Sequence, residues 1–347
     1  MANKRIFYAV QQVGIAPIGI TTFGSSHTIH GLQSVGINTN FNLEQIFEIG
    51  QLEIYENVEQ IPEVEITLEK VLDGYPLIYH LATSGSVTGT IAGRSNKKCQ
   101  VALSIFSDDQ DAASGTPLSQ CVVSGAYVSS LNYNFPADGS FSESVTLVCN
   151  NKIWKTSAFT FTGQFDNTDT PRAISGSGGV NRREDFIYDT GASNYTILPP
   201  DVDGISSSGT NNLDGNGDYG AHVQSAKVST SLGRDQLVEL GRRLPYHRYV
   251  NFPVEVRTDI EVISTRGDMV EGTEDGVEGD GSNLLHRHIR IKAREGTVLE
   301  LGTKNKLSTV TYGNANAGAK GGNATVTYSF LNFNTLTVSH PQDPSGL

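Results

Sequence analysis

The chain has 347 residues, enough for two ordinary domains that each bury a core. Its 37 Asp and Glu residues outnumber its 25 Lys and Arg residues. This composition argues against a nucleic-acid-binding protein, because such proteins bind phosphates through clustered Lys and Arg side chains. Apolar residues make up 37% of it, too many for a disordered chain, and no apolar run approaches the ~18 residues of a membrane span.

Glycine is abundant at 37 residues, and no segment carries a helical apolar stripe for more than about two turns. We therefore expect a mainly β protein. Residues 1–14 begin with basic side chains but lack the apolar stretch of a signal peptide, so we expect synthesis in the cytoplasm without export. Cys99, Cys121 and Cys149 are odd in number and lack metal-ligand spacing, which predicts reduced structural thiols.

An internal repeat organises the chain. Residues 32–62 align without gaps on residues 223–253, at an offset of 191 positions because 224 − 33 = 191. Glycine and proline punctuate both copies at the same places, which favours duplication over coincidence. The identical positions are Gln33/Gln224, Ser34/Ser225, Thr39/Thr230, Gln45/Gln236, Glu48/Glu239, Gly50/Gly241, Tyr55/Tyr246 and Pro62/Pro253.

Each copy predicts a strand, a short helix and a second strand. Residues 35–39 alternate apolar and polar side chains, as on a half-buried strand. Asn42 is an expected helix N-cap and Gly50 an expected left-handed helix end, so a helix is predicted between them. The second copy predicts the same helix over 235–241. A further strand is expected after the shared proline.

That further strand carries acidic side chains on one face. Residues 63–69 read EVEITLE, so acidic and apolar side chains point to opposite sides, and residues 254–261 alternate in the same way. An ordinary solvated face explains either strand alone, but its recurrence in both copies favours a shared acidic surface. The residues predicted to form this surface are Glu63, Glu65, Glu69, Glu255, Asp259 and Glu261.

The repeat predicts two tandem β-sandwich or barrel domains, each with a short α-helix. The expected limits are 1–165 for the first domain, 166–182 for a polar linker, 183–340 for the second domain and 341–347 for a C-terminal tail. Two further polar segments, 201–220 and 267–283, are expected to be exposed loops.

Three motifs suggest chemistry, and each has a simpler explanation. Asp189-Thr-Gly resembles the active-site motif of aspartic proteases, but the required carboxylate pair would need a homodimer because the chain has no second such motif. Residues 214–220 start like a calcium loop, with Tyr219 where the loop needs glycine. His286 and His288 share a strand face without further ligands. We predict no catalytic, cofactor-binding or metal-binding residues.

Several segments together carry a family resemblance. They are 121–135, CVVSGAYVSSLNYNF; 136–139, PADG; 144–154, SVTLVCNNKIW; 299–307, LELGTKNKL; and 323–330, NATVTYSF. These segments and the repeat resemble the tail-tube proteins of tailed phages. The resemblance implies a non-enzymatic virion protein whose β-sandwich domains close into stacked rings, which form a conduit for the genome.

Such rings usually contain six tube domains. A chain with two tube domains would build a pseudo-hexameric ring from three copies, with a ring of six chains as the alternative. The resemblance also implies other tail proteins as partners (a terminator, a baseplate and, where the tail has one, a sheath), no membrane, and a place in the virion tail. The six acidic residues are then expected to face the channel and keep passing DNA from adhering.

Two alternative functions remain open at this point. A different virion component, such as a baseplate or capsid-decoration protein, would also use β-sandwich domains, but it would form discrete oligomers rather than tubes. An aspartic protease would use Asp189 and would lose its activity on Asp189→Asn.

Overall fold

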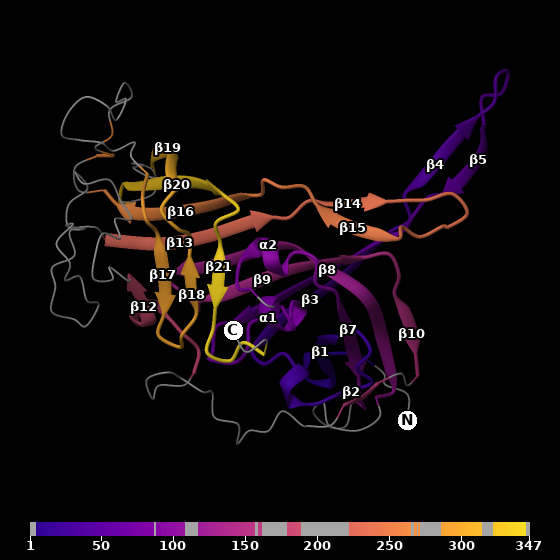
Figure 1. The fold of residues 1–347 in the computed structure, drawn as a ribbon, viewed down its shortest axis with the longest axis horizontal. Helices are drawn as coiled ribbons and strands as arrows, with labels where there is room; N and C mark the ends of the chain where they lie inside the picture. The colour runs from indigo at the N-terminus through magenta and orange to yellow at the C-terminus, as the bar shows by residue number, and fades with distance from the viewer. Residues whose placement is uncertain are drawn as a thin grey trace.

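The computed structural model describes residues 5–86, 88–107, 117–156, 159–161, 179–188, 222–264, 267–268, 270, 286–313 and 322–344. The described chain is mainly β-structure, which confirms the predicted fold class (Figure 1). Asp189, most of the expected linker and most of both expected loops lie outside the described residues. None of the described helices is long and apolar enough to cross a membrane.

The first half of the chain contributes eleven strands and both described α-helices. The strands are β1 (Gln11–Pro17), β2 (Thr22–Phe23), β3 (Leu32–Asn40), β4 (Leu43–Phe47), β5 (Ile54–Glu59), β6 (Glu63–Val71), β7 (Cys99–Ile105), β8 (Ser119–Pro136), β9 (Ser142–Cys149), β10 (Ile153–Lys155) and β11 (Thr160–Phe161). The helices α1 (Ile78–Ala82) and α2 (Ile91–Arg94) lie between β6 and β7.

The second half is built from strands and one described 3₁₀ turn, η3 (Arg183–Asp185). Its strands are β12 (Phe186–Tyr188), β13 (His222–Ser231), β14 (Arg234–Leu237), β15 (His247–Val250), β16 (Glu255–Ile263), β17 (Arg290–Ala293), β18 (Val298–Glu300), β19 (Lys306–Gly313), β20 (Thr325–Phe333) and β21 (Thr337–Ser339).

One long antiparallel sheet runs through both halves in the order β3-β6-β9-β8-β13-β16-β20-β19. The first four strands belong to the first half and the last four to the second, and β8 pairs with β13 where they meet. β8 also extends beyond this sheet, because its N-terminal part pairs with β7 and β10. Gly125, at φ +75°, is the extra residue of a bulge between these two parts of β8.

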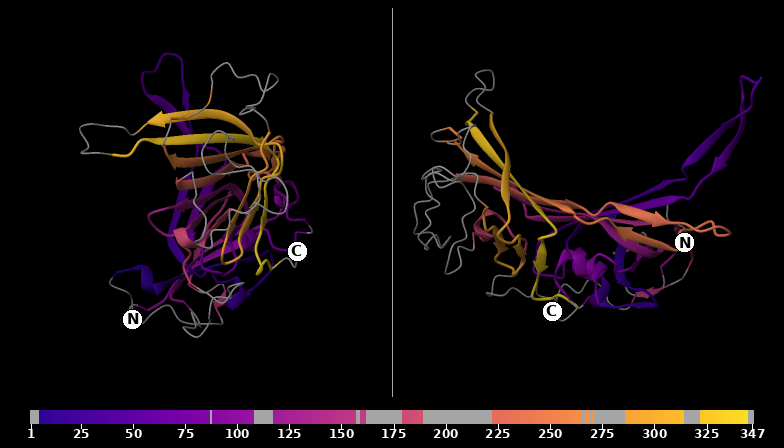
Figure 2. Two further views of the ribbon diagram at one scale, coloured as in Figure 1. Left: turned by 90° about the vertical axis from the view of Figure 1, so that its left-hand side faces the viewer. Right: turned by 45° about the horizontal axis from the view of Figure 1, so that its top comes forward.

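A second layer covers one face of the long sheet. In the first half it contains α1, β1 and β7, and in the second half a four-stranded sheet, β12-β17-β18-β21. Figure 2 (right) shows the long sheet as a band with this layer on one side, while the β19–β20 end and the β4–β5 hairpin bend toward the other side. The predicted sandwich arrangement thus has one covered and one open sheet face.

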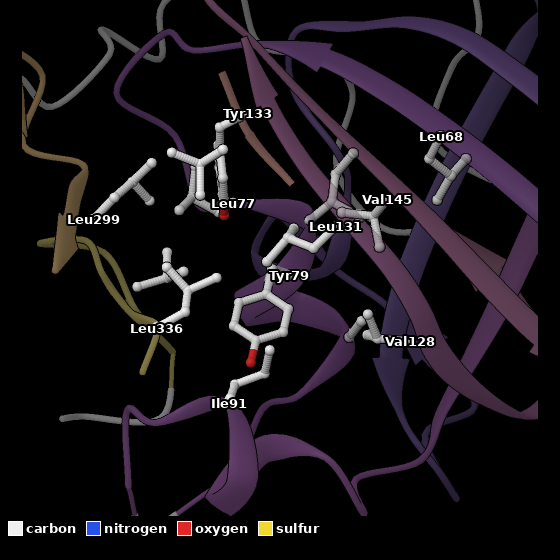
Figure 3. Close-up of a cluster of buried hydrophobic side chains, with 14 of the residues drawn as sticks. Leu68, Leu77, Tyr79, Ile91, Val128, Leu131, Tyr133, Val145, Leu299 and Leu336 are labelled. Atoms are coloured by element: carbon white, nitrogen blue, oxygen red, sulfur yellow. The ribbon is translucent and has the colours of Figure 1, made fainter. Parts of the chain in front are cut away.

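Most buried apolar side chains of both halves form one contiguous cluster, and a smaller one around Phe23 lies in the first half. Figure 3 shows Leu299 and Leu336 from the second half beside Leu77, Tyr79 and Tyr133 from the first. The residues after β21 also pack on the first half, where Asp343 forms a buried ion pair with Arg94 on α2. Residues 341–344 of the expected tail are therefore fixed to the first half.

The strands predicted around the repeat are confirmed, but the two helices predicted inside it are wrong. Residues 43–59 and 234–250 form β-hairpins, β4–β5 and β14–β15, which pair in the same register in both copies. Asn42 and Gly233 adopt left-handed φ values of 48° and 45° at the same repeat position, where each hairpin begins. The expected α-helix of the second domain is likewise absent from its described residues.

The physical reason lies in what surrounds these residues. A short helix is stable mainly when its apolar face packs against a core. Ile46 and Ile49, three positions apart, predicted such a face, yet Ile46 is 40% exposed and Ile49 fully exposed because the segment projects from the body (Figure 1). Pairing β4 with β5 satisfies the backbone hydrogen bonds there without a core.

Candidate functional site

The open face of the long sheet is the candidate functional surface. Along β6, burial alternates strictly: Val64, Ile66 and Leu68 are buried, while Glu65 and Glu69 are exposed on the opposite side. The alternation follows from the two-residue period of a strand whose apolar face contacts the second layer. The face predicted from EVEITLE is therefore present, and it is the uncovered one.

β16 repeats this arrangement at equivalent positions of a nine-residue strand. Glu255 is exposed, and Asp259 and Glu261 are half-buried on the same open face. Glu63 and Glu255 both begin their strands, and the seventh positions are both glutamate, Glu69 and Glu261. The structure thus brings all six predicted residues to one face of one sheet, on two strands that are four places apart in the strand order.

The seventh positions share a hydrogen bond as well. Ser34 on β3 donates its hydroxyl to Glu69 at 3.5 Å, and Ser225 on β13 donates to Glu261 at 3.2 Å. The two serines are identical positions of the sequence repeat, since 225 − 34 = 191. The two copies therefore hold an acidic side chain in the same way on the open face.

Basic side chains neutralise part of this face, which the prediction did not include. Arg257 lies between Glu255 and Asp259 on β16 and donates its Nε to both carboxylate oxygens of Asp259, at 2.9 and 3.1 Å. Lys227 on β13 lies opposite Asp259 in the sheet register. The two-residue alternation that identified the acids also places Arg257 and Lys227 on this face. The same alternation applied to β13 would therefore have predicted Lys227 there.

The six acids therefore fall into two groups. Glu63 is bound by Arg248, whose Nη1 lies 3.0 Å from Glu63 Oε1, and Asp259 is bound by Arg257. Within the described part of the chain, Glu65, Glu69, Glu255 and Glu261 form no ion pair. These four carboxylates give the open face its remaining negative charge.

Small polar side chains occupy most of the rest of the face, beside Leu331 and Phe333 on β20, and the sequence analysis missed them. Their signal is the same alternation, with Ser, Thr or Asn at every second position of the strands between and beyond β6 and β16. They are Ser142, Ser144 and Thr146 on β9; Asn132 and Asn134 on β8; Ser229 and Ser231 on β13; Thr325 and Thr327 on β20; and Thr309 and Thr311 on β19.

Both ends of the long sheet are open edges among the described strands. β3 pairs only with β6, and β19 pairs only with β20. Each strand therefore presents a row of backbone N–H and C=O groups on its outer side, and such edges favour pairing with another strand. The two edges lie at opposite ends of one sheet, and this arrangement can be extended by further copies of the chain.

Buried ionisable groups beneath the sheet have structural partners. Glu143 on β9 accepts hydrogen bonds from the backbone N–H groups of Ile78 and Tyr79 at 2.7 and 3.1 Å, and from the Tyr133 hydroxyl at 3.0 Å. Burial raises the pKa of Glu143, an effect opposed by nearby Lys70 and by these hydrogen bonds. Glu143 thus satisfies the N-terminal backbone of α1, which fixes the helix against the sheet.

The other chemical candidates are accounted for as follows. Asp189 and residues 214–220 lie outside the described residues. His288 Nε2 lies 2.8 Å from Oε1 of Glu300, the last residue of β18. Within the described ranges, no three His, Cys, Asp or Glu side chains lie close enough together to hold a metal ion. The three cysteines are free and buried. Burial raises the pKa of the Cys99 thiol to about 12, so it stays protonated at neutral pH.

Comparison with known proteins gives similarity at the level of structure only. No family model matches the sequence, and no curated protein matches it. The structure is similar to a chain of the anti-feeding prophage baseplate, with 11% identity and a TM-score of 0.33 over 45% of this chain and 97% of that one. It is also similar to a chain of the anti-feeding prophage tube-terminating cap, with 14% identity and a TM-score of 0.30 over 45% of this chain and 95% of that one.

A third similar structure is a chain of the sheath–tube complex of an extracellular contractile injection system in its extended state. It shares 15% identity and a TM-score of 0.31, over 44% of this chain and 93% of that one. All three are components of phage-tail-like particles, and each spans less than half of this chain.

Proposed function

We propose that this protein is a structural virion subunit of a phage-type tail tube, in which three chains close into a ring. The observation that carries the proposal is the order of the long sheet. β3-β6-β9-β8 and β13-β16-β20-β19 have the same connectivity, they are joined by β8–β13, and the outer edges β3 and β19 are unpaired. The β8–β13 junction within the chain therefore serves as the template for the proposed junction between chains.

The junction inside the chain predicts the junction between chains. β8 and β13 pair as Ser130↔Ser231, Asn132↔Ser229 and Asn134↔Lys227. The strand equivalent to β8 is β19, because each carries a bulge at the same place, between Val128 and Ser130 in β8 and between Leu307 and Thr309 in β19. The strand equivalent to β13 is β3, at the repeat offset of 191.

Transferring this register gives specific contacts between β19 of one chain and β3 of the next. Thr309 faces Asn40, Thr311 faces Asn38, and Gly313 faces Gly36 on the open side of the sheet. Tyr312, which is 53% exposed in the single chain, faces Ile37 on the covered side. Pairing in this register therefore continues the polar face across the junction and buries apolar side chains beneath it.

Three chains joined in this way form a closed sheet of three times eight, or twenty-four, strands. With strands ~4.8 Å apart and tilted by ~40°, the backbone cylinder has a diameter of roughly 48 Å, which leaves a water-filled channel. The open face lines this channel because the second layer covers the other side of the sheet. Glu65, Glu69, Glu255 and Glu261 then repel DNA phosphates, while hydroxyl and amide groups line most of the remaining wall.

Microscopy and cross-linking together test the proposal. The purified protein is expected to form rings or hollow tubes in negative stain, with a ring mass of three chains by mass photometry. Two double variants, Asn38→Cys/Thr311→Cys and Ile37→Cys/Tyr312→Cys, sample opposite faces of the predicted pairing. In an antiparallel ladder, opposing residues on one face form hydrogen-bonded pairs, and those on the other face form non-hydrogen-bonded pairs, whose side chains lie closer together. One of the two variants therefore samples the closer pairs, and at least one is expected to cross-link on oxidation.

The control changes the register and keeps the face. Ser34→Cys/Thr311→Cys places the first cysteine four residues from the predicted partner, more than ~13 Å along the strand, so it is expected to remain reduced. Discrete globular oligomers without a central hole, or equal cross-linking of the control, would contradict the proposal. The native cysteines do not interfere, because all three are buried.

A further inference from the structure

The β4–β5 hairpin projects from the body (Figure 1), and no described residue covers its large apolar side chains. Leu43 is 61% exposed and Phe47 65%, and Leu52 at the tip is fully exposed. Exposed apolar groups that recur along one projecting element mark an interaction surface. The occupant of that surface can be derived from the equivalent hairpin, β14–β15, because that hairpin already has a partner.

β14–β15 lies on the neighbouring half of the same chain through arginines. Arg234 donates its Nε to the Val128 carbonyl on β8 at 2.8 Å, and Arg248 donates to Asn150 at 3.2 Å and to Glu63 at 3.0 Å. A third arginine, at the hairpin tip, reaches the other hairpin: Arg243 lies 2.9 Å from Glu59 on β5. The second half thus uses its hairpin to hold the half that precedes it in the sheet.

At the equivalent positions, the first hairpin carries other side chains. Subtracting the offset of 191 from 234, 243 and 248 gives Leu43, Leu52 and Asn57. The residues that the three arginines contact also have counterparts in the second half. Val128 corresponds to Leu307, Glu59 to Val250 and Asn150 to Phe333. Phe333 is itself 55% exposed. Two of the three arginine positions therefore become leucines, which would meet aliphatic residues. The third becomes Asn57, which would lie beside Phe333 and Glu255, the counterpart of Glu63.

The charges of the two hairpins are complementary as well. Residues 42–62 contain five glutamates and no lysine or arginine, whereas residues 233–253 contain four arginines against one aspartate and one glutamate. Two acidic hairpins side by side would repel each other, and an acidic hairpin beside a basic one is attracted. In a ring of these chains, the acidic and basic hairpins alternate.

We propose that the β4–β5 hairpin docks on the second half of another copy in the same ring, across the β19–β20 end and against that copy's β14–β15 hairpin. This inference rests on the proposed ring. It adds contacts between hairpins to the strand pairing at each junction, so that acidic and basic hairpins alternate around the ring. Leu43, Leu52 and Asn57 then occupy the places that Arg234, Arg243 and Arg248 occupy within the chain.

Cross-linking separates this docking from other positions of the hairpin. In Asn57→Cys/Phe333→Cys, oxidation is expected to give covalent species that stop at three chains on a denaturing gel, because contacts within a ring close on themselves. A ladder that continues beyond three chains would mean axial docking between rings and would overturn the inference. The control Asn57→Cys/Trp154→Cys uses another exposed aromatic position and is expected to stay uncross-linked.

A surface variant adds a second readout. Leu52→Glu changes a fully exposed side chain, so the monomer keeps its fold by circular dichroism, yet ring formation is expected to fall by roughly tenfold through loss of a buried contact. Ile18→Glu, at a half-exposed position outside the hairpins, is the matched control and is expected to assemble normally. Normal assembly of Leu52→Glu would overturn the inference.

The outcomes also distinguish this inference from the proposed function. If rings form and either β3–β19 cysteine pair cross-links while Asn57→Cys/Phe333→Cys does not, the ring stands and the hairpin docks elsewhere. If no rings form and neither pair cross-links, the proposed function itself fails, and the docking fails with it.

Discussion

Arg248 on β15 donates a hydrogen bond to Glu63 at the start of β6, 185 residues earlier in the chain, at 3.0 Å. The arginine side chain is only 2% exposed, and its Nε also binds Asn150. This contact joins the hairpin of the second half to the acidic strand of the first. It also removes one of the six predicted acids from the freely charged face.

Replacing Arg248 therefore tests the junction between the halves. Arg248→Ala leaves Glu63 and Asn150 without their donor, and hydrogen bonds to charged groups contribute about 2 kcal/mol each at most sites. For the two bonds together, we expect the free energy of unfolding to fall by about 2–4 kcal/mol in urea titrations. Arg242→Ala removes an exposed arginine that binds Glu239, and it is expected to cost less than about 1 kcal/mol.

A second prediction concerns the ion pair of Arg94 and Asp343. Their side chains are 0% and 4% exposed, and the pair ties the C-terminal residues to α2. Breaking a buried pair leaves an uncompensated charge, which costs about 3–5 kcal/mol. We expect Asp343→Ala to lower the stability by that amount in denaturant unfolding, and a loss below about 1 kcal/mol would show that the C-terminal residues are not held there.

The pH dependence of stability provides a third prediction, centred on His80. Burial lowers the pKa of His80 from 6.5 to about 4, although Asp343 opposes this shift, and His80 Nε2 lies 3.1 Å from the Val338 carbonyl oxygen. The unfolded chain takes up this proton near pH 6.5 and the folded chain only near 4. The contribution is thus complete above pH 6.5 and is lost as pH falls toward 4, by about 3 kcal/mol.

The variant His80→Gln isolates that contribution. Its unfolding free energy is expected to depend less steeply on pH between 6.5 and 4 than that of the parent protein. Glu295 acts in the opposite direction, because burial raises its pKa to about 6 and its contribution is lost as pH rises through that value. Glu295 is the same in both proteins, so the difference between the two curves reports His80 together with its effect on the neighbouring His340, and parallel curves would rule out the assignment.

The fourth prediction concerns the charge of the open sheet face. Glu65→Lys/Glu69→Lys reverses two carboxylates that form no described ion pair, and the side chains are exposed, so the fold is retained. Assembled tubes of this variant are expected to retain duplex DNA fragments at 50 mM salt and to release them at higher salt, because phosphate binding is salt-dependent.

The control for that face is Glu184→Lys on η3, next to the covering layer, which changes the net charge by +2 against +4 in the double variant. Tubes of the control are expected to retain no more DNA than the parent tubes. Equal DNA retention by the parent tubes and by Glu65→Lys/Glu69→Lys would mean that the face does not line the channel.

The strands that follow a strict two-residue alternation were predictable from sequence. Glu63 to Val71 could be assigned a buried and an open face because an apolar face must be covered by other elements, and the structure has both faces as predicted. The hairpins were not predictable in this way. Their apolar residues are spaced as on the buried face of a helix, but they remain exposed in the single chain. The spacing therefore predicted a helix although no core packs against it.

By itself, the sequence determined the two copies, their strands and the side on which each acid lies, because these depend on local alternation and on identity at a fixed offset. Only the tertiary structure decided that β8 pairs with β13, that β3 and β19 are left as edges, and that Arg248 neutralises Glu63. Those outcomes depend on backbone and side-chain partners far apart in the chain, and no local pattern specifies them.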